Sequence, residues 1–361
     1  MASQIKLVLF EDSAQTQSQI LAALTKSLGD AGEVVPFDGG KAGESDADQK
    51  LMYEDRLERI LRQPPYDGVT LLFADRDLSK SQNFVGMSVS AVTGAAKRLA
   101  VPVCSYARQP APEEYKWRAR WEEGHIVLMS GTDEELARQA VLAAHGFVEI
   151  EAKLPKILKE KDSKSPAKIL SALLDRPEDS DKITLYSVGD QSRISDIPVK
   201  SKDEVDHVKR IGCFLGYWLW DSILRYPGLL VNEVAAASHL NIAADDFSKP
   251  EVRGVFNQAL YHGPFADPEK PQWWRGLLDD IVSLGDSNDG LDLAQKKLGD
   301  KVRPSQCWVD PSKSAGYYCI ISEKAVSLEN SKGGLSWFPR GADLTRISTP
   351  LFEEYGPWIG A

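Results

Sequence analysis

The apolar positions of the first 150 residues fall into short continuous runs that alternate with longer amphipathic stretches. Continuous apolar runs of roughly four to eight residues predict buried strands, and a period near 3.6 predicts helices. The predicted strands cover residues 5–10, 33–37, 69–74, 101–106 and 126–129. The predicted helices cover residues 14–28, 51–62, 85–99, 113–123 and 134–145. This alternation predicts an α/β fold, a doubly wound parallel sheet of order 2-1-3-4-5 with helices on both faces.

The second half has a different pattern. Helical periodicity recurs at residues 166–174, 203–224, 232–240, 250–261, 273–284 and 290–298. After Pro304 the apolar runs become short and β-like, at residues 306–309, 317–321 and 325–328. We therefore expect a mainly helical C-terminal domain with a small β appendage.

Residues 151–165 are rich in charge and separate the two patterns. We predict an α/β domain at 1–150, a charged linker at 151–165 and a Trp-rich, mainly helical domain at 166–361. The charged segment is also compatible with a solvated helix on the surface of the first domain.

Composition narrows the classes of partner. The chain has 361 residues and a net charge of −10, a sign that repels phosphate backbones, so we expect no nucleic-acid partner. No apolar segment reaches the roughly 18 to 20 residues that span a bilayer. The four cysteines form no C-x-x-C pair and no targeting segment precedes the first strand. We expect a cytoplasmic protein with reduced thiols and no membrane association.

Carboxylates end two of the predicted strands. Glu11 and Asp12 follow the first strand, and Asp75 follows the third. Ligands of open parallel sheets bind outside the carboxyl ends of the strands. Three converging carboxylates suit Mg²⁺, and one of them can attack phosphorus. The alternative is that Asp12 and Asp75 are ordinary carboxylates of strand ends or helix caps.

The residues around these carboxylates resemble a response-regulator receiver domain, over about residues 4–148. The first strand with its acidic pair is Leu-Val-Leu-Phe-Glu-Asp-Ser at 7–13, and the third is Leu-Leu-Phe-Ala-Asp-Arg-Asp-Leu at 71–78. The resemblance implies a CheY-like fold with Mg²⁺ held by Glu11, Asp12 and Asp75. It also implies transfer of a phosphoryl group to Asp75 from a histidine kinase or phosphotransfer protein.

The sequence departs from the receiver pattern at two positions. The family has Ser or Thr at the end of the fourth strand, where counting from Pro102 gives Ala107; Ser105 and Tyr106 are the nearby switch candidates. The family has Lys at the end of the fifth strand, where this chain has Met129 and Ser130. A phosphoaspartate needs a compensating donor, and Arg76 or Arg108 could supply it.

The second half carries no recognised catalytic or metal motif. Its seven tryptophans indicate a large aromatic core, or else a surface for a protein partner. The segment 352–359 is a candidate docking segment, and 232–242 resembles part of a helix-turn-helix unit, for which a packed helix pair is the simpler interpretation.

Three functions remain open. The first is a cytoplasmic bacterial signalling protein, in which the receiver-like domain controls a protein contact of the C-terminal domain. The second is a degenerate receiver that acts as a non-enzymatic adaptor or scaffold, for which we suggest a bacterial conflict or antiviral system. The third is an enzyme whose site lies in the C-terminal half; the absence of a catalytic motif argues against it.

Overall fold

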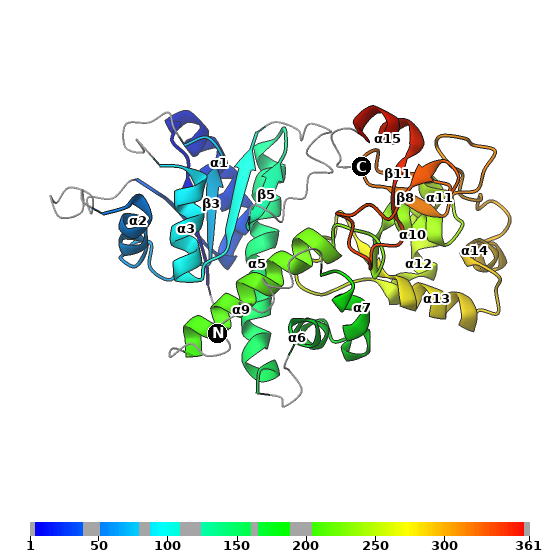
Figure 1. The fold of residues 1–361 in the computed structure, drawn as a ribbon, viewed down its shortest axis with the longest axis horizontal. Helices are drawn as coiled ribbons and strands as arrows, with labels where there is room; N and C mark the ends of the chain where they lie inside the picture. Colours follow the sequence, from blue (N-terminus) through cyan, green and yellow to red (C-terminus); the bar gives the residue numbers. More distant parts are fainter. Residues whose placement is uncertain are drawn as a thin grey trace. The chain divides into compact units, whose positions relative to one another are not determined.

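The computed structural model describes residues 4–38, 51–78, 87–108, 124–159, 165–187 and 204–356. These residues form two compact units (Figure 1). Unit 1 contains the described residues up to 159 together with 204–218, and unit 2 contains 165–187 and 219–356. Whether 1–150 and 166–361 behave as separate domains stays a prediction.

Unit 1 is built on a five-stranded parallel sheet of order β2-β1-β3-β4-β5, as the sequence predicts. The strands are β1 (Ile5–Phe10), β2 (Gly32–Pro36), β3 (Leu71–Asp75), β4 (Val103–Ala107) and β5 (Ile126–Met129). The central strands are apolar on both faces because helices cover both sides of the sheet.

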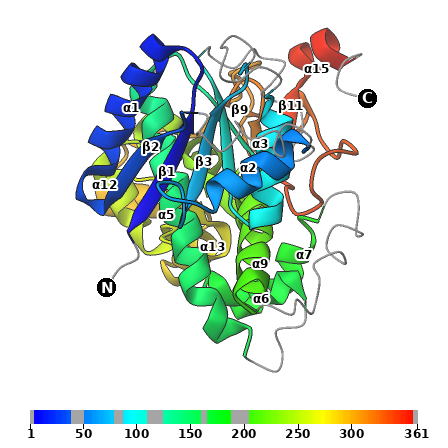
Figure 2. The same ribbon diagram turned by 90° about the vertical axis from the view of Figure 1, so that its left-hand side faces the viewer.

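Figure 2 shows α1 on one side of the strands and α2 and α3 on the other. The helices of this part are α1 (Ala14–Leu28), α2 (Tyr53–Leu61), α3 (Val89–Leu99) and α5 (Asp133–Ile157), and a 3-10 turn (Gly29–Ala31) follows α1. Val8, Phe10 and Leu72 pack into one buried cluster with α2 and α3. The predicted helix at 113–123, residues 85–86 of the predicted helix at 85–99 and most of the loop after residue 38 lie outside the described residues. Helix α3 begins at Val89, after its N-cap Ser88.

Helix α5 is longer than the sequence pattern predicts. It continues past residue 145 to Ile157, with Phe147, Ile150 and Leu154 buried along its second half. These side chains face α9 (Glu204–Trp218), a helix that follows the charged segment in the sequence. The residues that the sequence marks as a linker therefore begin as packed helix.

Unit 2 is mainly helical with a small mixed sheet, as predicted. Its helices are α6 (Pro166–Leu173), α7 (Ser180–Thr184), α10 (Glu233–His239), α11 (Ala244–Phe247), α12 (Pro250–Val255), α13 (Arg275–Leu284), α14 (Gly290–Leu298) and α15 (Thr349–Tyr355). Shorter turns are 3-10 helices at Pro177–Asp179 and Asn257–Ala259 and a π-helix at Leu219–Ile223. The sheet has the order β10-β11-β8-β9, from β8 (Tyr317–Cys319), β9 (Lys324–Val326), β10 (Ser331–Lys332) and β11 (Thr345–Ser348).

Two local predictions in unit 2 are wrong. Residues 306–309 form no strand; Gln306 makes only an isolated bridge with Ser314. The helix predicted from residue 273 begins at Arg275, because β7 (Gln272–Trp274) pairs antiparallel with β6 (Leu230–Asn232). A pairing across about forty residues decides both the strand and the helix start.

A large aromatic core fills unit 2, as the tryptophan content indicates. Trp273 is fully buried and meets Phe247 edge-on, with ring centroids 5.1 Å apart. Asp246, also buried, accepts hydrogen bonds from the backbone N–H and the guanidinium of Arg303.

Among the described residues, no helix combines the length and apolar character needed to cross a bilayer.

Candidate functional site

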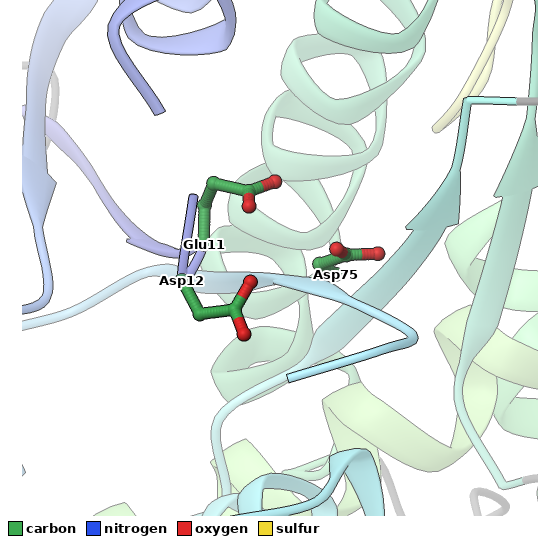
Figure 3. A group of neighbouring side chains, drawn as sticks. All are labelled: Glu11, Asp12 and Asp75. Atoms are coloured by element: carbon green, nitrogen blue, oxygen red, sulfur yellow. The ribbon is translucent and has the colours of Figure 1, made fainter. Parts of the chain in front are cut away.

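The structure brings Glu11, Asp12 and Asp75 together at the carboxyl edge of the sheet (Figure 3). Glu11 and Asp12 directly follow β1, and Asp75 is the last residue of β3. Because β1 and β3 are neighbours, with Phe10 opposite Ala74, their ends meet. One carboxylate oxygen from each of the three side chains lies within 4.8 Å of the others.

Hydrogen bonds hold Glu11 in a fixed orientation. Glu11 is buried, with only 2 % of the residue exposed. One carboxylate oxygen accepts from the backbone N–H of Ser13 at 2.8 Å, and the other accepts from the hydroxyl of Tyr106 at 2.6 Å. Ser13 is also the N-cap of α1, so the start of the helix and the orientation of Glu11 depend on the same turn.

Asp75 lies in an environment that disfavours its charge. It is partly buried, and desolvation together with the negative charges of Glu11 and Asp12 raises the pKa of Asp75 to about 6. The backbone N–H of Asp77 donates to Asp75 at 3.3 Å, which offsets only part of this effect. A cation between the carboxylates would relieve the repulsion, and three hard oxygen donors fit Mg²⁺.

The register of β4 places Tyr106 opposite Asp75. Ala107, the position that counting from Pro102 gives for the switch residue, is the next residue and ends β4. Tyr106 is fully buried and stacks on Phe73, with ring centroids 4.4 Å apart. Burial and the charge of Glu11 raise the pKa of its phenol well above the ordinary value.

The other switch candidate, Ser105, is not part of the acidic group. Successive side chains of a strand point to opposite faces, and the hydroxyl of Ser105 lies 2.8 Å from Nε2 of His125. Both residues are buried. Of the two hydroxyl candidates, only Tyr106 contacts a carboxylate of the site.

Arg108, just beyond β4, forms hydrogen bonds with Asp133 and Gln19. Its guanidinium makes a bidentate interaction with Asp133 at the start of α5 and donates to the side-chain oxygen of Gln19 at 2.8 Å. This side chain therefore connects α5 to α1. Its charge also interacts with Glu11, so it contributes positive potential at the edge of the site.

In the part of the chain that the structure describes, Glu11, Asp12 and Asp75 are the only group of three neighbouring His, Cys, Asp or Glu residues suited to a metal ion. The sequence motif signalled all three. It did not signal Tyr106 as the partner of Glu11, because that contact joins residues 95 positions apart.

No protein-family model, no curated protein and no solved structure matches this chain. The sheet order and the geometry of the acidic group are therefore the observations that bear on its function.

Proposed function

We propose that unit 1 is a receiver-like module that binds Mg²⁺ through Glu11, Asp12 and Asp75 and accepts a phosphoryl group on Asp75. The observation that carries this proposal is the convergence of the three carboxylates at the end of a 2-1-3-4-5 parallel sheet. Bound Mg²⁺ would supply positive charge for the phosphoryl oxygens. The carboxylate of Asp75 would form the new O–P bond as the P–N bond of a donor phosphohistidine breaks.

The donor in this proposal is a histidine kinase or a phosphotransfer protein, and unit 2 is the part that contacts a protein partner. Such a role fits a cytoplasmic signalling protein of a bacterium. Unit 2 offers some exposed aromatic surface for a partner: Trp308 is 37 % exposed, and the ammonium of Lys324 lies 5.0 Å from its ring centroid.

The first test is a Mg²⁺ titration followed by thermal unfolding. Ligand that binds only the folded state stabilises it, by about 2.7 kcal/mol at one hundred times the dissociation constant. We expect stabilisation in the wild type and none in Asp75→Ala. Asp30→Ala, which removes an exposed carboxylate elsewhere in unit 1, is the matched control and should respond as the wild type does. An equal response in Asp75→Ala contradicts the proposed site.

A second test addresses phosphorylation. With Mg²⁺ and acetyl phosphate, intact-mass spectrometry should detect a phosphoryl adduct in the wild type and none in Asp75→Asn. An adduct that persists in Asp75→Asn would move the acceptor to another residue.

The second candidate function is an adaptor that does not use phosphorylation. It is favoured by the commitment of the Tyr106 hydroxyl to Glu11 and of the Arg108 guanidinium to Asp133. The two candidates differ in their response to beryllofluoride with Mg²⁺. A change in partner binding that disappears in Asp75→Asn supports the phosphoryl-dependent module, and an unchanged affinity supports the adaptor.

A further inference from the structure

Tyr106 and Glu11 form a buried pair beside the acidic group. The phenol donates to a carboxylate oxygen of Glu11 at 2.6 Å, with the tyrosine 0 % and the glutamate 2 % exposed. A carboxylate this far from water needs donors to remain charged and ordered. Among the described residues, the backbone N–H of Ser13 is the other donor to its side-chain oxygens.

Tyr106 is itself held in place by packing. Its ring stacks on Phe73, two residues before Asp75 on the neighbouring strand, and its backbone lies opposite Asp75. The hydroxyl is therefore positioned by β3 and β4 but acts on the residue that follows β1. This arrangement joins the three strands that surround the site.

We propose that Tyr106 is a positioning residue of the metal site and sets its Mg²⁺ affinity by holding the carboxylate of Glu11. The inference rests on the proposed Mg²⁺ site and adds a residue that does not itself need to touch the ion. Removal of a hydrogen-bond partner behind a metal ligand typically weakens metal binding by about 10- to 100-fold. In Tyr106→Phe the ring and its stacking remain, and only the hydroxyl donor is lost.

The chain contains a matched control. Tyr66 is also buried in unit 1, lies against Phe37 and donates its hydroxyl to Asp38 at 2.6 Å. It belongs to the cluster under α2 and α3, whereas Tyr106 contacts the acidic group. Tyr66→Phe therefore removes an equivalent hydroxyl without touching Glu11.

The experiment measures Mg²⁺ affinity of the full chain by calorimetry, and independently by competition with Mn²⁺ followed by electron paramagnetic resonance. We expect roughly tenfold weaker binding in Tyr106→Phe and wild-type affinity in Tyr66→Phe. A double-mutant cycle with Glu11→Gln isolates the pair. If Tyr106 acts through Glu11, Tyr106→Phe should cause little further loss in the Glu11→Gln background.

Unchanged or tighter binding in Tyr106→Phe overturns the positioning role, as does a loss of the same size in the Glu11→Gln background. A wild-type chain that binds neither ion overturns the proposed function as well, so the two failures are distinct. If Tyr106→Phe does not fold, 3-fluorotyrosine in the wild-type chain replaces it, with the other tyrosine resonances assigned by Tyr→Phe substitutions. A Tyr106 fluorine signal that stays fixed while Mg²⁺ binds then overturns the role.

Discussion

Among the single residues of the site, Asp75 lies in an environment in which its charged form destabilises the folded protein. Burial and two neighbouring carboxylates disfavour its ionised form, which is why its pKa rises to about 6 from an ordinary 3.8. Functional groups are often found in such environments, because a bound ligand can offset the unfavourable free energy of the charged group. In this chain the ligand that fits is a cation.

Asp75→Asn should therefore stabilise the metal-free protein near neutral pH. A carboxyl whose pKa is raised on folding contributes stability below its unfolded pKa and loses it as pH rises through the folded value. The loss in the wild type should fall between about pH 4 and pH 6. One pKa unit corresponds to about 1.4 kcal/mol, and partial exposure of Asp75 reduces the effect to about 1–2 kcal/mol.

Thermal unfolding in a chelator across this pH range checks the prediction. The wild type should lose stability relative to Asp75→Asn as pH rises. The stability of Asp30→Asn should depend on pH as that of the wild type does. A destabilised Asp75→Asn at neutral pH would show that the charge of Asp75 is already compensated without metal.

At the scale of helices and strands, the packing of helix α5 against helix α9 is the main feature that the sequence pattern did not predict. Gly212 and Gly216 lie one turn apart on α9 and let it approach Phe147, Ile150 and Leu154 of α5 closely. A Cβ added at Gly216 would lie 2.2 Å from the Phe147 ring, whereas one at Gly212 would meet Leu154 at an ordinary 3.4 Å.

These two glycines give a matched pair of substitutions. Gly216→Ala should destabilise unit 1 by about 1–3 kcal/mol, because the buried Phe147 ring must move. Gly212→Ala should be neutral or stabilising by up to about 1 kcal/mol, because alanine favours the helix and meets its neighbours at ordinary distances. Denaturant unfolding compares them, and equal costs at both positions would contradict the close approach at Gly216.

Helix α9 also caps other elements of unit 1. Arg210 donates to the backbone carbonyls of Lys97 at 3.1 Å and Arg98 at 2.9 Å, at the end of α3. The hydroxyl of Tyr217 accepts from the backbone N–H of Val103 at 2.7 Å, at the start of β4. Helix ends and strand starts leave backbone groups that need such partners.

Over its full length, the chain therefore returns to unit 1 after passing through residues 165–187 of unit 2. The predicted boundary at residues 151–165 would separate α9 from the other elements of unit 1. The charge-rich composition of 151–165 is typical of a linker. Only the tertiary contacts show that the chain returns to unit 1 after this segment.

A chain of residues 1–164 should be less stable than a chain of residues 1–218. The shorter chain exposes the buried face of α5 and loses the partners of Lys97, Arg98 and Val103. Differential scanning calorimetry of the two chains should show the lower midpoint for 1–164. Equal midpoints would support the boundary at 151–165 and show that α9 is dispensable.

Much of unit 1 follows from the sequence because its determinants are local. A buried parallel strand is a continuous apolar run, and the carboxylates at the ends of β1 and β3 stand beside those runs, so the sheet and the Glu11, Asp12 and Asp75 group could be predicted. The sequence did not determine which residue of β4 lies opposite Asp75.

Features that join distant residues depend on the tertiary structure. The position of Tyr106 opposite Asp75 follows from the register between β3 and β4, and a shift of one residue would have put Ala107 there. The contact of Tyr217 with Val103 spans 114 residues. No local pattern encodes such a pair, because its free energy arises only when both segments are already packed against the same sheet.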